Sequence, residues 1–239
     1  MNPAAISITN LSKTFGKQNV LKDVSFSIMQ GEYVGLVGVN GAGKTTLIKC
    51  LLDFCSIDAG SISIFGTDHQ LKDARNNLTY LPEKFVPPYY LTGENFLMYM
   101  SELNGVTYHS DAVTKMLKIL DLDSSALTKP VRQYSKGMGQ KLGLAACMLS
   151  GKDLMVFDEP MSGLDPKARA LLKRHLLELK QLGKTLFYST HLLEDVAALC
   201  DRVVILHDGN VCFSGTTQEC CEKYQADNFE AAYLKCVGG

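Results

Sequence analysis

The chain has 239 residues, 46% of them hydrophobic, and its 24 Lys and Arg residues nearly balance 25 Asp and Glu residues. This length suits one α/β domain or a domain with a sub-domain, and the hydrophobic fraction is too high for a disordered chain. The formal net charge of -1 argues against a protein that coats nucleic acid, which would carry a basic excess.

The first residues of the chain have neither the basic flank nor the apolar run of a signal peptide. No later stretch approaches the roughly 18 apolar residues that span a bilayer, so composition predicts a soluble cytosolic protein. Short strand-like runs alternate with segments of helical length, which is typical of a parallel sheet covered by helices. Residues 5–9 and 21–28 alternate polar and apolar side chains and predict an antiparallel flap, whereas the apolar run 33–37 predicts a central buried strand.

Further elements follow from helical spacing, from a proline that opens a helix and from turn residues. They are strands at 61–65, 154–157 and 185–188, helices at 111–120 and 166–182, and a hairpin of 203–206 with 211–213. Residues 84–150 are mostly helical in pattern, and buried strands lie on either side of them. We interpret them as a helical sub-domain inserted into a core of residues 1–83 and 151–216, which a helical tail of residues 217–239 follows.

A glycine-rich loop follows the predicted central strand and leads into a helical run. It has the pattern G-x-x-x-x-G-K-[ST] in the strand–loop–helix context that a phosphate-binding loop requires. The glycines let backbone amides converge on phosphate oxygens, and the N-terminus of the helix adds partial positive charge. The residues predicted to bind the nucleotide are Gly38, Asn40, Gly41, Ala42, Gly43, Lys44, Thr45 and Thr46. The loop alone does not distinguish a kinase, a GTPase, a helicase and a transport ATPase.

Two acidic residues end the predicted strand 154–157. Asp158, at the carboxyl edge of the sheet, is expected to hold Mg²⁺ beside the Thr45 hydroxyl, while Lys44 reaches the β- and γ-phosphates. Glu159 is expected to orient and deprotonate an attacking water. With a phosphate loop upstream, this pair predicts a nucleotide hydrolase.

Between these motifs lies the run Tyr-Ser-Lys-Gly-Met-Gly-Gln-Lys of residues 134–141, followed by an amphipathic segment. Here the sequence resembles the ATP-binding-cassette (ABC) ATPase family, whose L-S-G-G-Q signature lies at a helix N-terminus. In that family the signature faces the γ-phosphate of ATP bound to the opposite subunit. The resemblance implies that Ser135 and Gly137 bind ATP across a dimer, and a helix N-terminus with a hydroxyl suits an anion.

Further motifs occur in the order of the family. Residues 162–165, Ser-Gly-Leu-Asp, resemble the loop that communicates between the two sites of a dimer, so Asp165 is expected at bound ATP. His191 resembles the histidine that touches the γ-phosphate and the water beside Glu159. Phe15 stands where the family places an aromatic ring that stacks on adenine. The resemblance covers roughly residues 5–216.

The implied fold is that of an α/β P-loop NTPase, with a RecA-like parallel sheet core, an antiparallel β flap and an inserted helical signature sub-domain. Three residues depart from the family pattern. Glu83 stands where most members have a glutamine that touches Mg²⁺ and contacts the membrane partner, and Lys136 and Met138 replace Gly and Gln of the signature. A carboxylate can still bind Mg²⁺, so Glu83 joins Thr45 and Asp158 as a predicted ligand. The pattern Y-L-P-E with Y-S-K-G-M resembles the ATPase subunits of ABC-2-type exporters.

Residues 80–99 contain six aromatic residues, although aromatic residues make up only 8% of the chain. Aromatic side chains often anchor protein interfaces. We therefore expect residues 85–91 to line a groove that receives a cytoplasmic helix of a membrane partner. The alternative is that these side chains pack inside the helical sub-domain.

The resemblance thus implies an ATPase subunit that drives a separately encoded transmembrane permease, in the direction of export, from the cytoplasmic face of the membrane. It would act with ATP and Mg²⁺ as a homodimer, or as a pseudo-dimer with a related ATPase, and without nucleic acid. The predicted catalytic residues are Lys44, Glu159 and His191. One alternative stays open: a soluble single-cassette ATPase of an iron–sulfur assembly system, although the eight cysteines show no cluster spacing.

Overall fold

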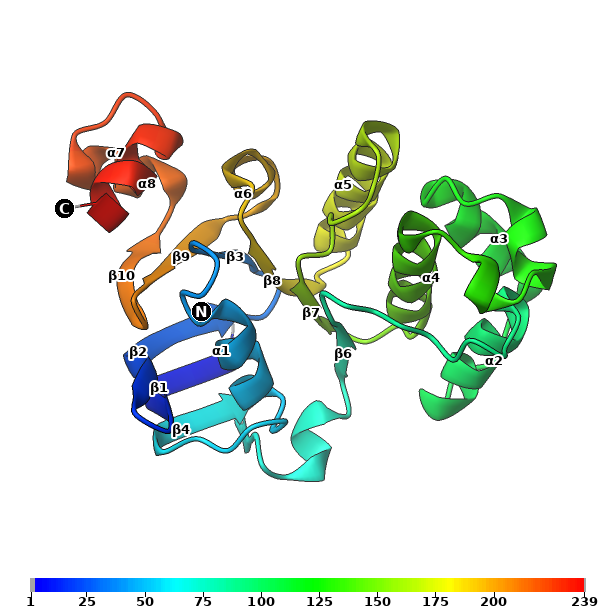
Figure 1. Ribbon diagram of the computed structural model, residues 1–239, viewed down its shortest axis with the longest axis horizontal. Coiled ribbons are helices and arrows are strands. Elements are labelled where there is room, and N and C mark those ends of the chain that lie inside the picture. Colours follow the sequence, from blue (N-terminus) through cyan, green and yellow to red (C-terminus); the bar gives the residue numbers. More distant parts are fainter. Residues whose placement is uncertain (1–2, 239) are drawn as a thin grey trace.

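A six-stranded sheet forms the centre of the fold, which is a computed structural model that describes residues 3–238 (Figure 1). Its strand order is β10-β9-β3-β8-β7-β6, in which β10 is antiparallel to β9 and the other neighbours are parallel. The strands are β3 (Tyr33–Val37), β6 (Leu78–Leu81), β7 (Leu154–Asp158), β8 (Thr185–Thr190), β9 (Arg202–His207) and β10 (Asn210–Gly215). Every residue of β3, β7 and β8 is buried, which confirms the predicted central strand.

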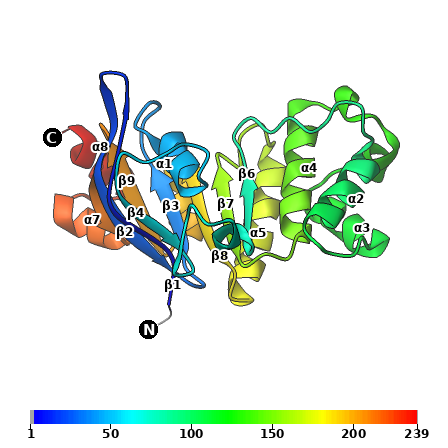
Figure 2. The ribbon, with the colours of Figure 1, turned by 90° about the horizontal axis from the view of Figure 1, so that it is seen from below.

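A second, antiparallel sheet has the order β2-β1-β4-β5 and forms the predicted flap. Its strands are β1 (Ala4–Phe15), β2 (Gln18–Met29), β4 (Ala59–Ile64) and β5 (Thr67–Asp68). The first two strands are longer than predicted and form a long hairpin, which Figure 2 shows projecting beyond the neighbouring strands. Register shifts after Ile8 and Leu11 break the alternation of side chains in the outer part of β1, so the sequence pattern does not extend to Phe15.

A hydrophobic core fills the space between the two sheets. It combines side chains of the flap, such as Ile6 and Leu21, with Leu47 of the helix α1 (Lys44–Leu51) and Val34 of β3. The flap and the central sheet therefore hold α1 from opposite sides, and they fix the N-terminus of this helix at the carboxyl end of β3.

Helices between β6 and β7 gather at the end of the molecule far from the flap (Figure 1). They are α2 (Gly93–Leu103), α3 (Ser110–Ile119) and α4 (Lys136–Leu149), with short 3₁₀ helices at Ser124–Thr128 and Val131–Gln133. Both α2 and α3 pack against α4, and α3 is the helix predicted at residues 111–120. We keep as a proposal the division into a sub-domain of residues 84–150 and a core of residues 1–83 and 151–216.

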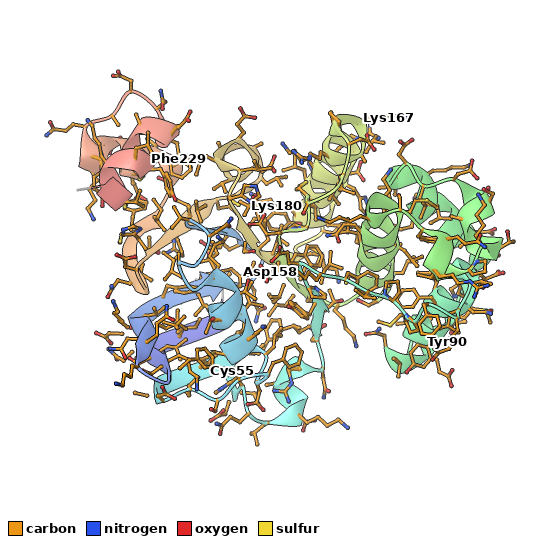
Figure 3. All side chains as sticks on the ribbon, viewed as in Figure 1. Cys55, Tyr90, Asp158, Lys167, Lys180 and Phe229 are labelled. Carbon is orange, nitrogen blue, oxygen red and sulfur yellow. The ribbon has the colours of Figure 1, made fainter. Side chains whose placement is uncertain are left out.

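The other face of the central sheet is covered by α5 (Pro166–Gln181) and α6 (Leu193–Leu199). The C-terminal segment forms α7 (Thr217–Tyr224) and α8 (Phe229–Gly238), and a 3₁₀ helix spans Lys72–Arg75. Figure 3 labels Phe229 at the start of α8, where this ring is buried in the same core as α6. Residues 1, 2 and 239, which the sequence assigned to the core and the tail, lie outside the described residues.

The architecture is the α/β fold predicted from the sequence: a parallel sheet core, an antiparallel flap and added helices. Across residues 3–238, no helix has both the length and the apolar character needed to cross a membrane.

Candidate functional site

A cleft of about 380 Å³ opens at the carboxyl ends of the parallel strands. In α/β sheets, ligands bind outside this edge because the loops that leave adjacent strands converge there. Loops after β3, β6, β7 and β8 all reach the cleft, together with one residue of β2. The lining residues are Val20, Asn40, Gly41, Gly43, Lys44, Thr45, Thr46, Glu83, Asp158, Glu159, Ser162 and His191.

The loop after β3 has a backbone that its glycines make possible. Gly41 and Gly43 have positive φ angles of 87° and 107°, which L side chains rarely adopt, and Gly43 caps α1. Gly38 lies so close to β9 that a Cβ there would overlap the carbonyl oxygen of Leu206. The loop can therefore turn its amide groups inward at the N-terminus of a helix, as an anion site requires.

Lys44 lies over this loop and is only 6% exposed. Its Nζ donates to the carbonyl oxygens of Gly38, at 2.7 Å, and Val39, at 3.3 Å. Burial lowers the pKa of Lys44, and the nearby carboxylates of Glu159 and Asp158 oppose this shift. An anionic ligand in the cleft would likewise favour the charged ammonium.

Asp158 ends β7 and is 1% exposed. Its Oδ1 accepts a hydrogen bond from the Ser189 hydroxyl on β8, whereas its buried Oδ2 has no hydrogen-bond partner. An unpaired oxygen of a buried carboxylate is costly, and a cation in the cleft would satisfy it. Thr45 and Glu83 line the same cleft, and oxygen ligands of this kind suit Mg²⁺. The residues present therefore fit the magnesium ion that the sequence predicts.

Glu159 and His191 form a hydrogen-bonded pair beside Asp158. The Glu159 Oε2 lies 3.0 Å from the His191 Nδ1, and the glutamate side chain is 12% exposed. Glu159 has a positive φ of 50°, and its backbone N–H donates to the carbonyl and hydroxyl oxygens of Ser189. A left-handed conformation costs roughly 1–2 kcal/mol for a residue with a Cβ, and such strain often occurs at functional sites.

The signature run lies beside the cleft and contributes none of its lining residues. Ser135 caps α4, because its hydroxyl accepts from the Met138 N–H at 3.2 Å, and it does not line the cleft. A Cβ on Gly137 would lie 2.8 Å from the carbonyl oxygen of Gly163, so only glycine fits there without a shift. Lys136 donates from Nζ to the Ser162 hydroxyl at 3.3 Å, which joins the signature to the cleft rim of its own chain.

Asp165 caps α5 in the same way, with its Oδ1 accepting from the Ala168 N–H at 3.0 Å. This hydrogen bond, with the neighbouring charge of Lys141, lowers the pKa of Asp165. The carboxylate is therefore anionic at neutral pH and available as a helix cap.

The structure brings together most, but not all, of the residues predicted from the sequence. Predicted residues that do not line the cleft are Phe15, Gly38, Ala42, Ser135, Gly137 and Asp165. Phe15 is 52% exposed at the end of β1, with the Lys13 ammonium 5.2 Å from the ring centroid. Adenine stacking by Phe15 therefore stays a prediction.

Sequence reasoning missed Val20 and Ser162 as lining residues. Val20 reaches the cleft only because the flap packs on α1, where its carbonyl oxygen lies beside Gly43. No sequence signal marks such a contact between distant segments. Ser162, by contrast, belongs to the Ser-Gly-Leu-Asp run and could have been included from its place after Glu159.

A second hollow of about 410 Å³ lies beside the cleft, between the segment after β6 and the start of α4. Glu83 lines both cavities. Phe85 packs against Phe96 within the core, whereas Tyr89 and Tyr90 are 68% and 72% exposed and lie 5.6 Å apart. Figure 3 shows Tyr90 among the helices at the end of the molecule, away from Asp158 at its centre. The aromatic run is thus divided between core and surface.

Comparisons with known proteins show which family this chain is similar to. Residues 21–162 match the family model described as ABC transporter. The chain is 38% identical to an uncharacterised ABC transporter ATP-binding protein of Synechocystis over 85% of its length, and it spans only 58% of that relative. It is 36% identical to the Nod factor export ATP-binding protein I of Burkholderia orbicola, with 87% of this chain and 70% of the relative covered. A solved ATP-binding subunit of an ABC transporter superimposes with a TM-score of 0.89 at 31% identity, over 97% of this chain and 99% of that one.

Proposed function

The chain belongs to the ABC transporter family, and on this basis we propose that it is the subunit that binds and hydrolyses ATP to drive a transmembrane permease. One observation carries the proposal: a cleft at a strand–loop–helix anion site that also contains a buried, half-paired aspartate and a Glu–His pair. This combination suits a phosphate chain, a divalent cation and a water nucleophile.

Each group has a role that its position supports. The loop amides and Lys44 hold the phosphates, and Thr45, Asp158 and Glu83 would hold Mg²⁺, which supplies charge neutralisation at the phosphates when bound. Glu159 accepts a proton from the attacking water, and His191 holds the glutamate carboxylate.

Phosphate release from ATP by the purified chain tests this function. We expect ADP and phosphate in the presence of Mg²⁺, and no phosphate release once EDTA removes the metal. Without a cation between them, the carboxylates of the cleft repel the negatively charged phosphates. Transfer of the phosphoryl group to an acceptor hydroxyl, or hydrolysis unaffected by EDTA, would contradict the proposal.

The positions of Ser135 and Gly137 outside the cleft of their own chain support a dimer, because the family resemblance expects both residues at bound ATP. We propose that two copies, or this chain and a related ATPase, associate head to tail around two ATP molecules. Each ATP then contacts the phosphate loop of one chain and Ser135 and Gly137 of the other, and Asp165 lies in the loop that communicates between the two sites.

The permease partner and the direction of export are supported by the Burkholderia relative, which is named as an export protein. Such a subunit acts at the cytoplasmic face of the membrane, held there by its permease. The relatives described here are transporter ATP-binding proteins, and they lend no support to the iron–sulfur assembly alternative. We propose that the side of the hollow formed by residues 84–89 receives a cytoplasmic helix of the permease, since Glu83 lines both this hollow and the nucleotide cleft. Ser135, on the other side of the hollow, is left to the second chain.

Replacing Tyr89, which lines the hollow, and Tyr90, whose ring packs against it, with alanine should weaken association with the permease by about tenfold or more. Exposed aromatic anchors carry much of the binding energy of an interface. Co-purification of the permease with the chain measures this loss. Leu182→Ala is the matched control, since Leu182 is 74% exposed but does not line the hollow. Equal recovery of permease with the double variant and with the parent chain would exclude this docking surface.

A further inference from the structure

His191 has open space on the side away from Glu159. It lines both the cleft and a separate cavity of about 520 Å³ between α5, α6 and Glu230 of α8. Its side chain is 56% exposed, so packing does not hold the ring. The position of His191 therefore depends on the backbone that joins β8 to α6.

This backbone leads into the short helix α6, whose position depends on contacts with other elements. α6 has seven residues, and its later part is seated on the sheet by Val196 and Leu199, which are buried. Near its start, the Leu192 N–H donates to the Thr190 hydroxyl at 3.0 Å, and the Asp195 N–H donates to the Leu192 carbonyl oxygen. Asp195 is thus tied to the residue that follows His191.

Asp195 makes an ion pair with Lys173 of α5 through its Oδ1. The aspartate side chain is 4% exposed and the lysine side chain 27% exposed. The Asp195 Oδ2 is buried without a hydrogen-bond partner. A buried carboxylate in this state depends on its cationic partner, because loss of that partner leaves an uncompensated charge.

We propose that Lys173 and Asp195 are positioning residues that hold the first turn of α6 against α5 and so keep His191 within hydrogen-bond distance of Glu159. Neither residue lines the nucleotide cleft. The proposal rests on the proposed function, since it requires that Glu159 and His191 act on the attacking water. The ion pair also connects the His191 segment to α5. This helix begins after Asp165, in the loop that faces the second chain of the proposed dimer.

A second ion pair on α5 provides a control that distinguishes the positioning of His191 from a general loss of protein stability. Lys180 pairs with Asp201 at 2.7 Å, and its side chain is 27% exposed, as is that of Lys173. Neither Lys180 nor Asp201 lines the cleft or contacts the start of α6 through a hydrogen bond. Lys180→Met therefore removes a comparable lysine from the same helix without touching the His191 segment.

The experiment compares Lys173→Met, Asp195→Asn, the double variant and Lys180→Met. We expect each single change at the pair to lower kcat about tenfold, because a displaced catalytic group loses its alignment. ATP affinity, measured in a Glu159→Gln background where ATP is not consumed, should stay within about twofold of the parent. The double variant should be no slower than the slower single variant, because the two changes remove the same ion pair. Lys173→Arg should restore most of kcat, and Lys180→Met should retain it.

A parental kcat in Lys173→Met and Asp195→Asn would overturn the proposal. So would an equal loss of kcat in Lys180→Met, or a fall in ATP affinity as large as the fall in kcat. If Lys173→Met does not fold, Asp195→Asn decides, because it keeps the shape of the side chain. Failure of the parent chain to release phosphate from ATP in the presence of Mg²⁺ would instead contradict the proposed function, whatever the variants of the pair show.

Discussion

Glu159→Gln should stop ATP hydrolysis while leaving ATP binding intact. The glutamate carboxylate lies 3.0 Å from His191 and next to the buried Asp158, where it can accept a proton from water. An amide of the same shape cannot accept that proton. Loss of a general base costs roughly 10²–10⁴ in rate, so we expect kcat to fall at least about 100-fold. Steady-state phosphate release measures kcat, and equilibrium binding of ATP measures affinity.

Glu102→Gln is the control for this change. It removes the same negative charge from a residue that is exposed on α2 and lies outside the cleft. It should hydrolyse ATP like the parent. If Glu159→Gln also hydrolysed ATP at the parental rate, the assignment of the base would be wrong. If it lost ATP binding as well, Glu159 would act in binding rather than in the chemical step.

Ser135→Arg should abolish hydrolysis for a different reason. Ser135 caps α4 outside its own cleft, at the surface proposed to meet ATP on the second chain. An arginine there would fill the space that the γ-phosphate needs and remove the hydroxyl, so we expect kcat to fall about 100-fold, as for loss of a transition-state donor. Binding of ATP to the single chain should not change, because Ser135 does not line that cleft.

Ser110→Arg is the matched control, since Ser110 is an exposed first residue of the helix α3. The loss of a helix cap costs about 1 kcal/mol, so thermal unfolding should confirm that Ser135→Arg remains folded under the assay conditions. Full hydrolysis by Ser135→Arg would show that the signature does not contact ATP.

The central strands could be predicted because burial on both faces leaves an unbroken apolar run, as in residues 33–37. The bounds of the strand β6 could not be predicted, because only Thr79 and Leu81 of its four residues are buried and they form no continuous apolar run. The helix α2 was predicted only as part of the mostly helical segment 84–150, without bounds of its own. Its aromatic residues are divided between the core and the surface, which obscures the helical period of the apolar side chains.

The phosphate loop was predictable because its chemistry requires glycines and a lysine at fixed local spacing. Contacts between distant segments carry no such signal. Val20 enters the cleft through the packing of the flap, and the sequence shows it only as one residue of an alternating strand. Lys173 and Asp195 belong to no motif in the sequence, and the pair forms only because α5 packs against α6.

Mixing the two inactive chains, Glu159→Gln and Ser135→Arg, tests directly whether each ATP site is built from two chains. A mixed dimer contains one complete site: the intact cleft of the Ser135→Arg chain faces the intact signature of the Glu159→Gln chain. If the chains pair at random, half of the dimers are mixed, so an equimolar mixture should recover about a quarter of the parental ATPase rate. A mixture that stays as inactive as either chain alone would contradict the shared site.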